Sequence, residues 1–383
     1  MKSFFKTIFT LLCFSIFTSC KADKKNDTPL LAVKESPKPS KQYIKVALLL
    51  DTSNSMDGLI DQAKSQLWKI VNELSYAKCE DAKPNLQIAL YEYGNDNLNS
   101  KEGYIRQVLS FSEDLDEISK QLFSLTTKGG NEYCGQVITT ALDQLSWHDN
   151  PDDLKLIFIA GNEPFDQGEI SYSKATKTAN AKDVTVNTIF CGNYEQGIAS
   201  HWKNGADLAR GNYMAIDHNQ ATTYVATPYD DAILNYNTKL NKTYIAYGKL
   251  GQQKRHLQAS QDKEAQSYGE SNAVSRIVSK GSHLYKNDSW DLVDASKKDS
   301  FKYDDLKTEE LPAELKGKSK TEIEAYVSKK KIERERIQAE IKTLNKKRKA
   351  FITEQQKGDA NGLESAMIKA IKTQAKKKNY KWD

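Results

Sequence analysis

Apolar residues follow two different periods between residues 43 and 245. Nearly continuous aliphatic runs at Tyr43–Leu50 and Leu154–Ala160 predict strands buried on both faces of a sheet. Further strands are predicted at Asn85–Gly94, Tyr104–Phe111, Val184–Cys191 and Tyr213–Ile216. Apolar residues spaced by three or four predict helices at Leu59–Leu74, Leu115–Leu125, Cys134–Leu145, Ser171–Lys182, Ala199–Arg210 and Tyr229–Leu240. This alternation predicts one α/β domain over residues 43–245, a doubly wound, mostly parallel sheet with helices on both faces.

The pattern changes after this domain. Residues 246–318 are polar with scattered aromatic residues, and we expect a mostly extended or partly helical connector. Ser319 and Glu322 have the spacing of a capping box, which predicts the start of a long amphipathic helix over residues 319–357. The helix resembles a coiled-coil segment, but three basic residues on its apolar stripe argue against a strict coiled-coil seam. Residues 358–383 are predicted to be a basic C-terminal tail.

Charge is unevenly spread along the 383 residues, of which 38% are hydrophobic and 28% charged, with a formal net charge of +5. From Lys320 to Asp383 there are 18 Lys and Arg against 9 Asp and Glu, so the remainder of the chain is net acidic. A general nucleic-acid binder is therefore excluded. The charge of the long helix is interpreted first as a solvated face, and second as a surface for an anionic partner.

The N-terminus predicts an extracytoplasmic location. Lys2 and Lys6 precede a short apolar run, Ile8–Phe17, which is typical of a secretory signal over residues 1–19. The residues Phe17-Thr18-Ser19-Cys20 resemble the lipobox of bacterial lipoproteins, which implies lipidation of Cys20 and attachment to a membrane of the bacterial envelope, on its periplasmic or cell-surface face. The alternative is an ordinary signal peptide with an incidental cysteine. Residues 20–42 are polar and rich in Lys and Pro, as expected of a disordered tether.

Three oxygen-bearing side chains follow the first predicted strand in alternation: Asp51, Ser53 and Ser55. In a doubly wound sheet, ligands bind beyond the carboxyl ends of the strands, where the strand order reverses. Oxygen donors suit a hard cation such as Mg²⁺. The alternative is that Asp51 or Ser55 only caps the helix that begins near Met56.

The motif Asp51-x-Ser53-x-Ser55 resembles the metal-ion-dependent adhesion site of the von Willebrand factor A family, and the resemblance extends over residues 43–245. It implies a Rossmann-like sheet and a divalent cation, Mg²⁺ or else Mn²⁺ or Ca²⁺. In that family the serines contact the metal directly, and the aspartate does so directly or through water. The family binds proteins or other extracellular ligands and is not generally catalytic.

Two further loops depart from the family pattern. Where the second loop normally supplies a threonine, this chain has Asn131 and Glu132, and Thr127 is a less fitting substitute. Where the third loop normally supplies an aspartate, it has Gly161, with Asn162, Glu163 and Asp166 as residues that could compensate. Glu163-Pro164 also fits an ordinary loop turn. The predicted ligands are Asp51, Ser53, Ser55 and Glu132, with Asn131 and Glu163 as further candidates.

Apart from Cys13 and Cys20, the chain has three cysteines, Cys79, Cys134 and Cys191. Cys134 lies in the second loop and Cys191 ends a strand at the carboxyl edge of the sheet, so a disulfide between them is predicted. The alternative is that both cysteines are small buried residues that never pair. None of the cysteine spacings is a zinc pattern, and no histidine stands out as the partner of a catalytic thiol.

The leading hypothesis is a lipid-anchored, extracytoplasmic binding protein that recognises a protein or other acidic ligand through the metal. The alternative is a structural or assembly scaffold of the envelope with a degenerate, metal-free site and a long helix that mediates contacts. A hydrolase has no support, because the sequence offers no nucleophile–base pair, zinc signature or phosphate loop. The prediction is therefore of a protein that is not an enzyme.

Overall fold

The computed structural model describes residues 41–79, 82–219, 224–355 and 363–382, and Lys41–Asp383 form one compact unit. The predicted signal, most of the predicted tether and Cys20 lie outside the described residues. None of the helices in the described ranges is both long and apolar enough to cross a membrane.

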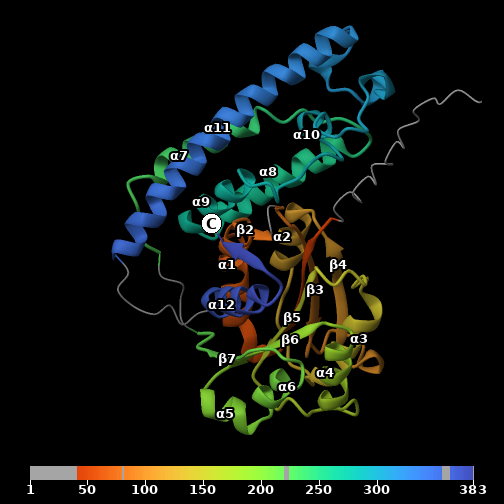
Figure 1. Cartoon of the computed structure of the whole chain (residues 1–383), viewed down its shortest axis with the longest axis vertical. Helices are drawn as coiled ribbons and strands as arrows, with labels where there is room; N and C mark the ends of the chain where they lie inside the picture. Colours follow the sequence, from red (N-terminus) through yellow and green to blue (C-terminus); the bar gives the residue numbers. More distant parts are fainter. Residues whose placement is uncertain (1–40, 80–81, 220–223, 356–362, 383) are drawn as a thin grey trace, which may run out of the picture. The chain divides into compact units, whose positions relative to one another are not determined.

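The centre of the unit is a six-stranded sheet in the order β4-β3-β1-β5-β6-β7 (Figure 1). Its strands are β1 (Tyr43–Asp51), β3 (Asn85–Tyr93), β4 (Ile105–Ser112), β5 (Leu154–Gly161), β6 (Thr185–Cys191) and β7 (Tyr213–Ile216). All pairings are parallel except that of β4, which runs antiparallel to β3. The predicted mostly parallel sheet is confirmed, and the strand order reverses around β1, which pairs with both β3 and β5.

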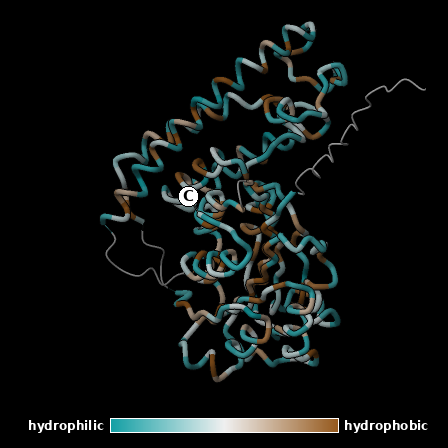
Figure 2. The backbone as a smooth tube through the Cα atoms, in the orientation of Figure 1, coloured by the Kyte–Doolittle hydropathy of each residue, from teal (hydrophilic) through white to brown (hydrophobic). Residues whose placement is uncertain are grey.

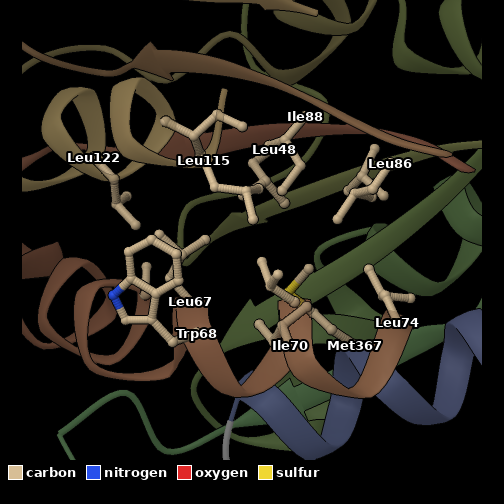
Figure 3. Close-up of a cluster of buried hydrophobic side chains, with 14 of the residues drawn as sticks. Leu48, Leu67, Trp68, Ile70, Leu74, Leu86, Ile88, Leu115, Leu122 and Met367 are labelled. Carbon is tan, nitrogen blue, oxygen red and sulfur yellow. The ribbon is translucent and has the colours of Figure 1, made fainter. Parts of the chain in front are cut away.

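Alternate residues of β1 face two separate cores, because successive side chains of a strand point to opposite faces. Leu48 and Leu50 join one core with α1 (Asp57–Leu74) and α2 (Leu115–Phe123). Figure 3 shows Leu67, Trp68 and Ile70 of α1 packed with Leu48 in this cluster. Ala47 and Leu49 join the other core with α3 (Cys134–Gln144), α4 (Tyr172–Ala181) and α6 (Trp202–Leu208). A short helix, α5 (Tyr194–Ala199), precedes α6. Both faces are thus covered, which explains the nearly continuous apolar runs.

The segment predicted as a connector is more helical than expected. It contains α8 (Gly251–Ser267), α9 (Glu270–Lys280) and α10 (Leu292–Ala295), after α7 (Asp230–Asn241). Val274 and Ile277 of α9 are buried in the core that α1 also lines. The overall polarity of the segment concealed this narrow apolar stripe, and charged residues of α9 are themselves buried in ion pairs.

The long helix is confirmed as α11 (Lys320–Gln355), and its predicted capping box is present, since the Ser319 amide donates to the Glu322 carboxylate over 2.8 Å. Figure 2 shows that the helix is largely hydrophilic, with apolar residues at intervals. Arg334 of its stripe pairs with Asp291 at 2.6 Å, and Arg348 pairs with Asp230 at 2.7 Å. The helix packs against α7, α9 and α10, so these basic residues form buried ion pairs within the chain.

The C-terminal segment predicted as a basic tail is folded as part of the compact unit. Residues 363–382 contain α12 (Leu363–Lys376) and β8 (Tyr380–Trp382), which pairs antiparallel with β2 (Ala77–Cys79). Leu363, Met367 and Ile371 are buried in the α1 core (Figure 3 shows Met367). Since these apolar residues recur every four positions, they are a helical signal that the many lysines obscured.

Candidate metal centre

The first loop of the site brings three oxygen-bearing side chains together. Asp51 ends β1 and is fully buried, and its Oδ1 accepts a 2.7 Å hydrogen bond from the Ser53 amide. The hydroxyl oxygens of Ser53 and Ser55 lie 3.2 Å apart. A short 3-10 turn, Asn54–Met56, leads into α1, and neither that turn nor α1 has a side-chain cap. The capping alternative for Asp51 and Ser55 is therefore wrong, and their side chains remain available to a ligand.

The second loop adds a buried carboxylate. Glu132 is 4% exposed, whereas Asn131 is exposed to solvent. The structure therefore places Glu132 beside the first loop and leaves Asn131 outside the site. Asp51 and Glu132 approach each other beside Gly94, where an added Cβ would lie 2.6 Å from Glu132 Cγ and 2.9 Å from Asp51 Oδ1. Gly94 has φ +77°, so both its backbone conformation and the space around it require glycine.

Burial raises the pKa values of both carboxyl groups. Burial raises the pKa of Asp51 to about 7, and burial together with the charge of Asp51 raises the pKa of Glu132 to about 9. Hydrogen bonding from Ser53 lowers both pKa values and only partly offsets the increase. Asp51 Oδ2 and Glu132 Oε2 are buried and have no hydrogen-bond partner among the described residues. Unpartnered buried carboxylate oxygens of this kind are costly unless they are protonated or bind a cation.

These residues fit a hard divalent cation. Two carboxylates and two hydroxyls converge at the carboxyl edge of the sheet, and oxygen is the donor that Mg²⁺ and Ca²⁺ prefer. Within the described part of the chain there is no group of three or more His, Cys, Asp or Glu side chains arranged to hold a metal. A cation at this site therefore depends on the serine hydroxyls as well as the carboxylates.

The third loop contributes an amide in place of a carboxylate. The Asn162 Nδ2 donates to the Ser55 hydroxyl over 3.1 Å. Glu163 is exposed and accepts a 3.3 Å hydrogen bond from the Gln167 side chain, although its charge helps to raise the pKa values of both buried carboxyls. Asp166 is also exposed and lies 3.6 Å from His201. Of the residues that could compensate for Gly161, only Asn162 contacts the site residues.

Tyr93 is a residue of the site that sequence reasoning missed. It is fully buried at the end of β3, and its hydroxyl donates to the Ala160 carbonyl over 3.0 Å. A Cβ at Gly161 would lie 2.6 Å from this hydroxyl and 3.0 Å from Asp51 Oδ2. Tyr93 thus occupies the space that an aspartate at position 161 would need. Its place at the carboxyl end of a parallel strand was the available signal.

Hydrogen bonds between loops fix the site. Asn95 Nδ2 donates to the Thr126 carbonyl over 2.9 Å and lies 3.3 Å from the Thr52 carbonyl. The Lys128 amide donates to that same Thr52 carbonyl over 2.9 Å. Thr127 donates to Asp57 at the start of α1, so it does not serve as a ligand. The first and second loops are therefore joined before any ligand binds.

The predicted disulfide between Cys134 and Cys191 is not formed, because both are free, buried thiols. Cys134 belongs to the core on one face of the sheet and Cys191 to the core on the other. The sheet separates them, although both lie at its carboxyl edge. Burial raises the pKa of each thiol well above its usual range, which makes both inert as nucleophiles.

The raised carboxyl pKa values predict a pH effect on the metal-free protein. Protonation of Asp51 and Glu132 favours the folded state, so their contribution is complete below about pH 4 and is lost as pH rises through about 7 and 9. We expect chelator-treated protein to lose at least about 2 kcal/mol from these groups between pH 5 and 9. Urea unfolding at several pH values measures the loss, and added Mg²⁺ should reduce it.

Glu132→Gln is the control for this pH effect. Lys280, whose pKa is lowered to about 8, acts in the opposite direction, and the comparison with Glu132→Gln removes its contribution. The variant should show a flatter pH profile than the unmodified protein. Identical profiles for the two proteins would contradict the assignment.

A further prediction concerns Gly161→Asp. Although this change supplies the aspartate of the family pattern, we expect it to destabilise the fold by about 1–3 kcal/mol, because the added side chain collides with Tyr93. Asn162→Asp is the matched change, since it places the carboxylate beside Ser55, where there is room, and it should tighten Mn²⁺ binding about tenfold. Urea unfolding and calorimetric titration check both. A stable Gly161→Asp protein that binds Mn²⁺ more tightly would refute this reasoning.

Comparison with known proteins gives one family. Residues 45–208 match the family model of the von Willebrand factor type A domain. Among solved structures, similarity is found to BatB from Bacteroides thetaiotaomicron (16% identity, 45% of this chain and 90% of that chain, TM-score 0.35) and to the SpRpn10 VWA domain (14%, 47% and 99%, 0.35). An aerotolerance-related membrane protein from Bacteroides fragilis NCTC 9343 is also similar (17%, 46% and 93%, 0.31). A search of curated proteins found no match.

Proposed function

Because residues 45–208 are a von Willebrand factor type A domain, we propose that this chain is a binding protein that recognises an acidic ligand on a partner protein through a divalent cation. Asp51, Ser53, Ser55 and Glu132 would hold the cation, which is Mg²⁺ or else Mn²⁺ or Ca²⁺. When bound, the cation supplies an open coordination position that a ligand carboxylate can occupy. Domains of this family are typically interaction modules, and binding is accordingly proposed in place of catalysis.

One observation carries the proposal. Two buried carboxyl groups, each with an unpartnered oxygen, lie beside two serine hydroxyls at the carboxyl edge of the sheet. Burial of two like charges at one place is unfavourable unless a proton or a cation neutralises them, and a divalent cation can do so for both groups. Tyr93 and Asn95 hold the surrounding loops, so the arrangement is not a product of a loose surface loop.

The proposal includes an envelope location. The chain begins with the secretory pattern described above, and Cys20 would carry a lipid that attaches the folded unit to a membrane. Metabolic labelling with a radioactive or alkyne-bearing fatty acid tests this part, with Cys20→Ser as the control. Incorporation that persists in Cys20→Ser would remove the lipid anchor from the proposal.

Gly161 favours one competing function, a structural or assembly scaffold of the envelope whose site binds no metal. Isothermal titration of residues 41–383 with Mg²⁺, Mn²⁺ and Ca²⁺ separates the two. Binding of one ion with a 1:1 stoichiometry supports the adhesion-type function, and no heat with any of the three supports the scaffold. The partner would then be identified as an envelope protein that is retained by immobilised residues 41–383 and released by a chelator. The same protein should not be retained by the Asp51→Asn variant.

A further inference from the structure

The last two elements of the chain form a strongly basic surface. Residues 363–382 contain six lysines and a single acidic residue, Glu364. On α12 the apolar residues Met367 and Ile371 are buried against α1. Lys369, Lys372 and Lys376 recur every three or four positions, so they lie together on the opposite side of the helix.

Two of the six lysines are neutralised within the unit. Lys372 pairs with Glu73, and Lys378 pairs with Asp183 at 2.7 Å. The other four are exposed, and none of them forms an ion pair with an acidic side chain among the described residues. We call these four the lysine surface: Lys369, Lys376, Lys377 and Lys381.

The lysine surface lies where the N-terminal segment joins the folded unit. The Tyr380 hydroxyl of β8 donates to the Asp152 carbonyl over 3.0 Å and lies 3.5 Å from the Tyr43 carbonyl. Tyr43 begins β1, and the preceding chain enters the compact unit at Lys41. Figure 1 shows β2, the partner of β8, close to the C-terminal end of the chain.

The metal centre lies at the other end of the same strand. Asp51 ends β1, eight residues beyond Tyr43, and a strand rises about 3.3 Å per residue. Tyr43, which lies beside Tyr380 of β8, and Asp51 of the metal centre are therefore separated by roughly 25 Å along β1. A partner bound at one end of the strand leaves the other end free.

We propose that the lysine surface docks on a bilayer of anionic phospholipids. Clustered lysines without acidic partners are attracted to the negative surface potential of such a bilayer. A bilayer is the partner that fits the position, because the segment that enters beside Tyr380 carries Cys20, the proposed site of the lipid. This choice of partner rests on the membrane attachment of the proposed function. Docking in this way directs the metal centre away from the membrane.

Vesicle binding tests the proposal with residues 41–383, which form the compact unit and contain neither the apolar run nor Cys20. We expect co-sedimentation with phosphatidylglycerol vesicles at low salt, little with phosphatidylcholine vesicles, and release at high salt. Replacement of all four residues of the lysine surface by Gln should weaken binding at least tenfold. The matched control replaces four exposed lysines elsewhere and should weaken binding less than threefold: Lys101→Gln, Lys174→Gln, Lys177→Gln and Lys316→Gln.

Two results would overturn the docking surface: no binding of the unmodified unit to phosphatidylglycerol vesicles, or equal weakening in both quadruple variants. The second result would mean that only the total charge matters. Mn²⁺ titration of the same variants distinguishes this failure from failure of the metal-dependent function, because the lysine surface contacts no residue of the metal centre. Unchanged Mn²⁺ affinity and unfolding temperature show that the variants are folded.

Discussion

Asp51→Asn is expected to weaken Mg²⁺ and Mn²⁺ binding at least about 100-fold, which corresponds to roughly 3 kcal/mol. Asp51 is fully buried, and its Oδ2 faces the site without a hydrogen-bond donor. In a site with few waters, one negative charge close to a divalent ion is worth several kcal/mol, and asparagine removes that charge while keeping the shape. Isothermal titration measures the affinity.

The same substitution should stabilise the metal-free protein at pH 8. At pH 8 Asp51, with a pKa of about 7, is largely ionised, whereas Glu132, with a pKa of about 9, is largely protonated, so asparagine removes the cost of burying the Asp51 charge. This opposite effect on affinity and stability distinguishes loss of a ligand from general damage to the fold. Asp57→Asn is the control, since Asp57 is an exposed carboxylate at the start of α1 and asparagine keeps an oxygen that accepts the hydrogen bond from Thr127. Both quantities should stay near those of the unmodified protein. Unchanged Mn²⁺ affinity in Asp51→Asn would refute the metal centre.

Arg276→Met is expected to reduce the free energy of unfolding by about 3–5 kcal/mol. Arg276 is 1% exposed and pairs with Asp116 of α2 at 2.8 Å and with Asp262 of α8 at 2.7 Å. Its guanidinium also lies 4.8 Å from the ring of Trp68 in α1. Methionine fills much of the space but leaves Asp116 buried without its cation, and such an uncompensated charge is more costly than the lost contacts.

Urea unfolding measures this loss, and Lys254→Met provides the control. Lys254 forms a comparable ion pair with Asp114 at 2.7 Å, but this pair is partly exposed and should contribute less than about 1 kcal/mol. Hydrogen exchange should show that α8 and α9 lose protection together with α1 in Arg276→Met. Similar losses of stability in the two variants would contradict the claim that α8 and α9 are part of one folded unit with the sheet.

The fold of residues 43–245 could be predicted because its signals are local. The central strands β1 and β5 are buried on both faces, so their apolar runs are nearly continuous, and each covering helix has one apolar stripe. The same reasoning missed α12, because lysines dominate the composition of this segment. The large apolar residues that it buries occur only once in every four positions. It also underestimated the helical content of residues 246–318, because part of what α9 buries is charged.

The candidate site was only partly predictable. The alternation Asp51-x-Ser53-x-Ser55 places three donors at the end of β1, and the structure brings them together. The choice of Glu132 over Asn131 depends on which side chain turns inward at Gly94, and the sequence does not contain that information. The contact of Asn162 with Ser55 likewise depends on how the loop after β5 lies relative to the loop after β1.

The sequence alone determined the order of the six strands of the central sheet, the position of the Asp-Ser-Ser motif at its carboxyl edge, and the start of the long helix at Ser319. These follow from periodicity and from capping chemistry, which act within a few residues of the chain. Only the tertiary structure decided that Cys134 and Cys191 lie on opposite sides of the sheet, that Tyr93 occupies the place of an aspartate beside Gly161, and that Arg334 is a buried ion-pair partner. Those outcomes depend on which residues distant in sequence share one small volume, and close packing fixes them only when the whole chain has folded.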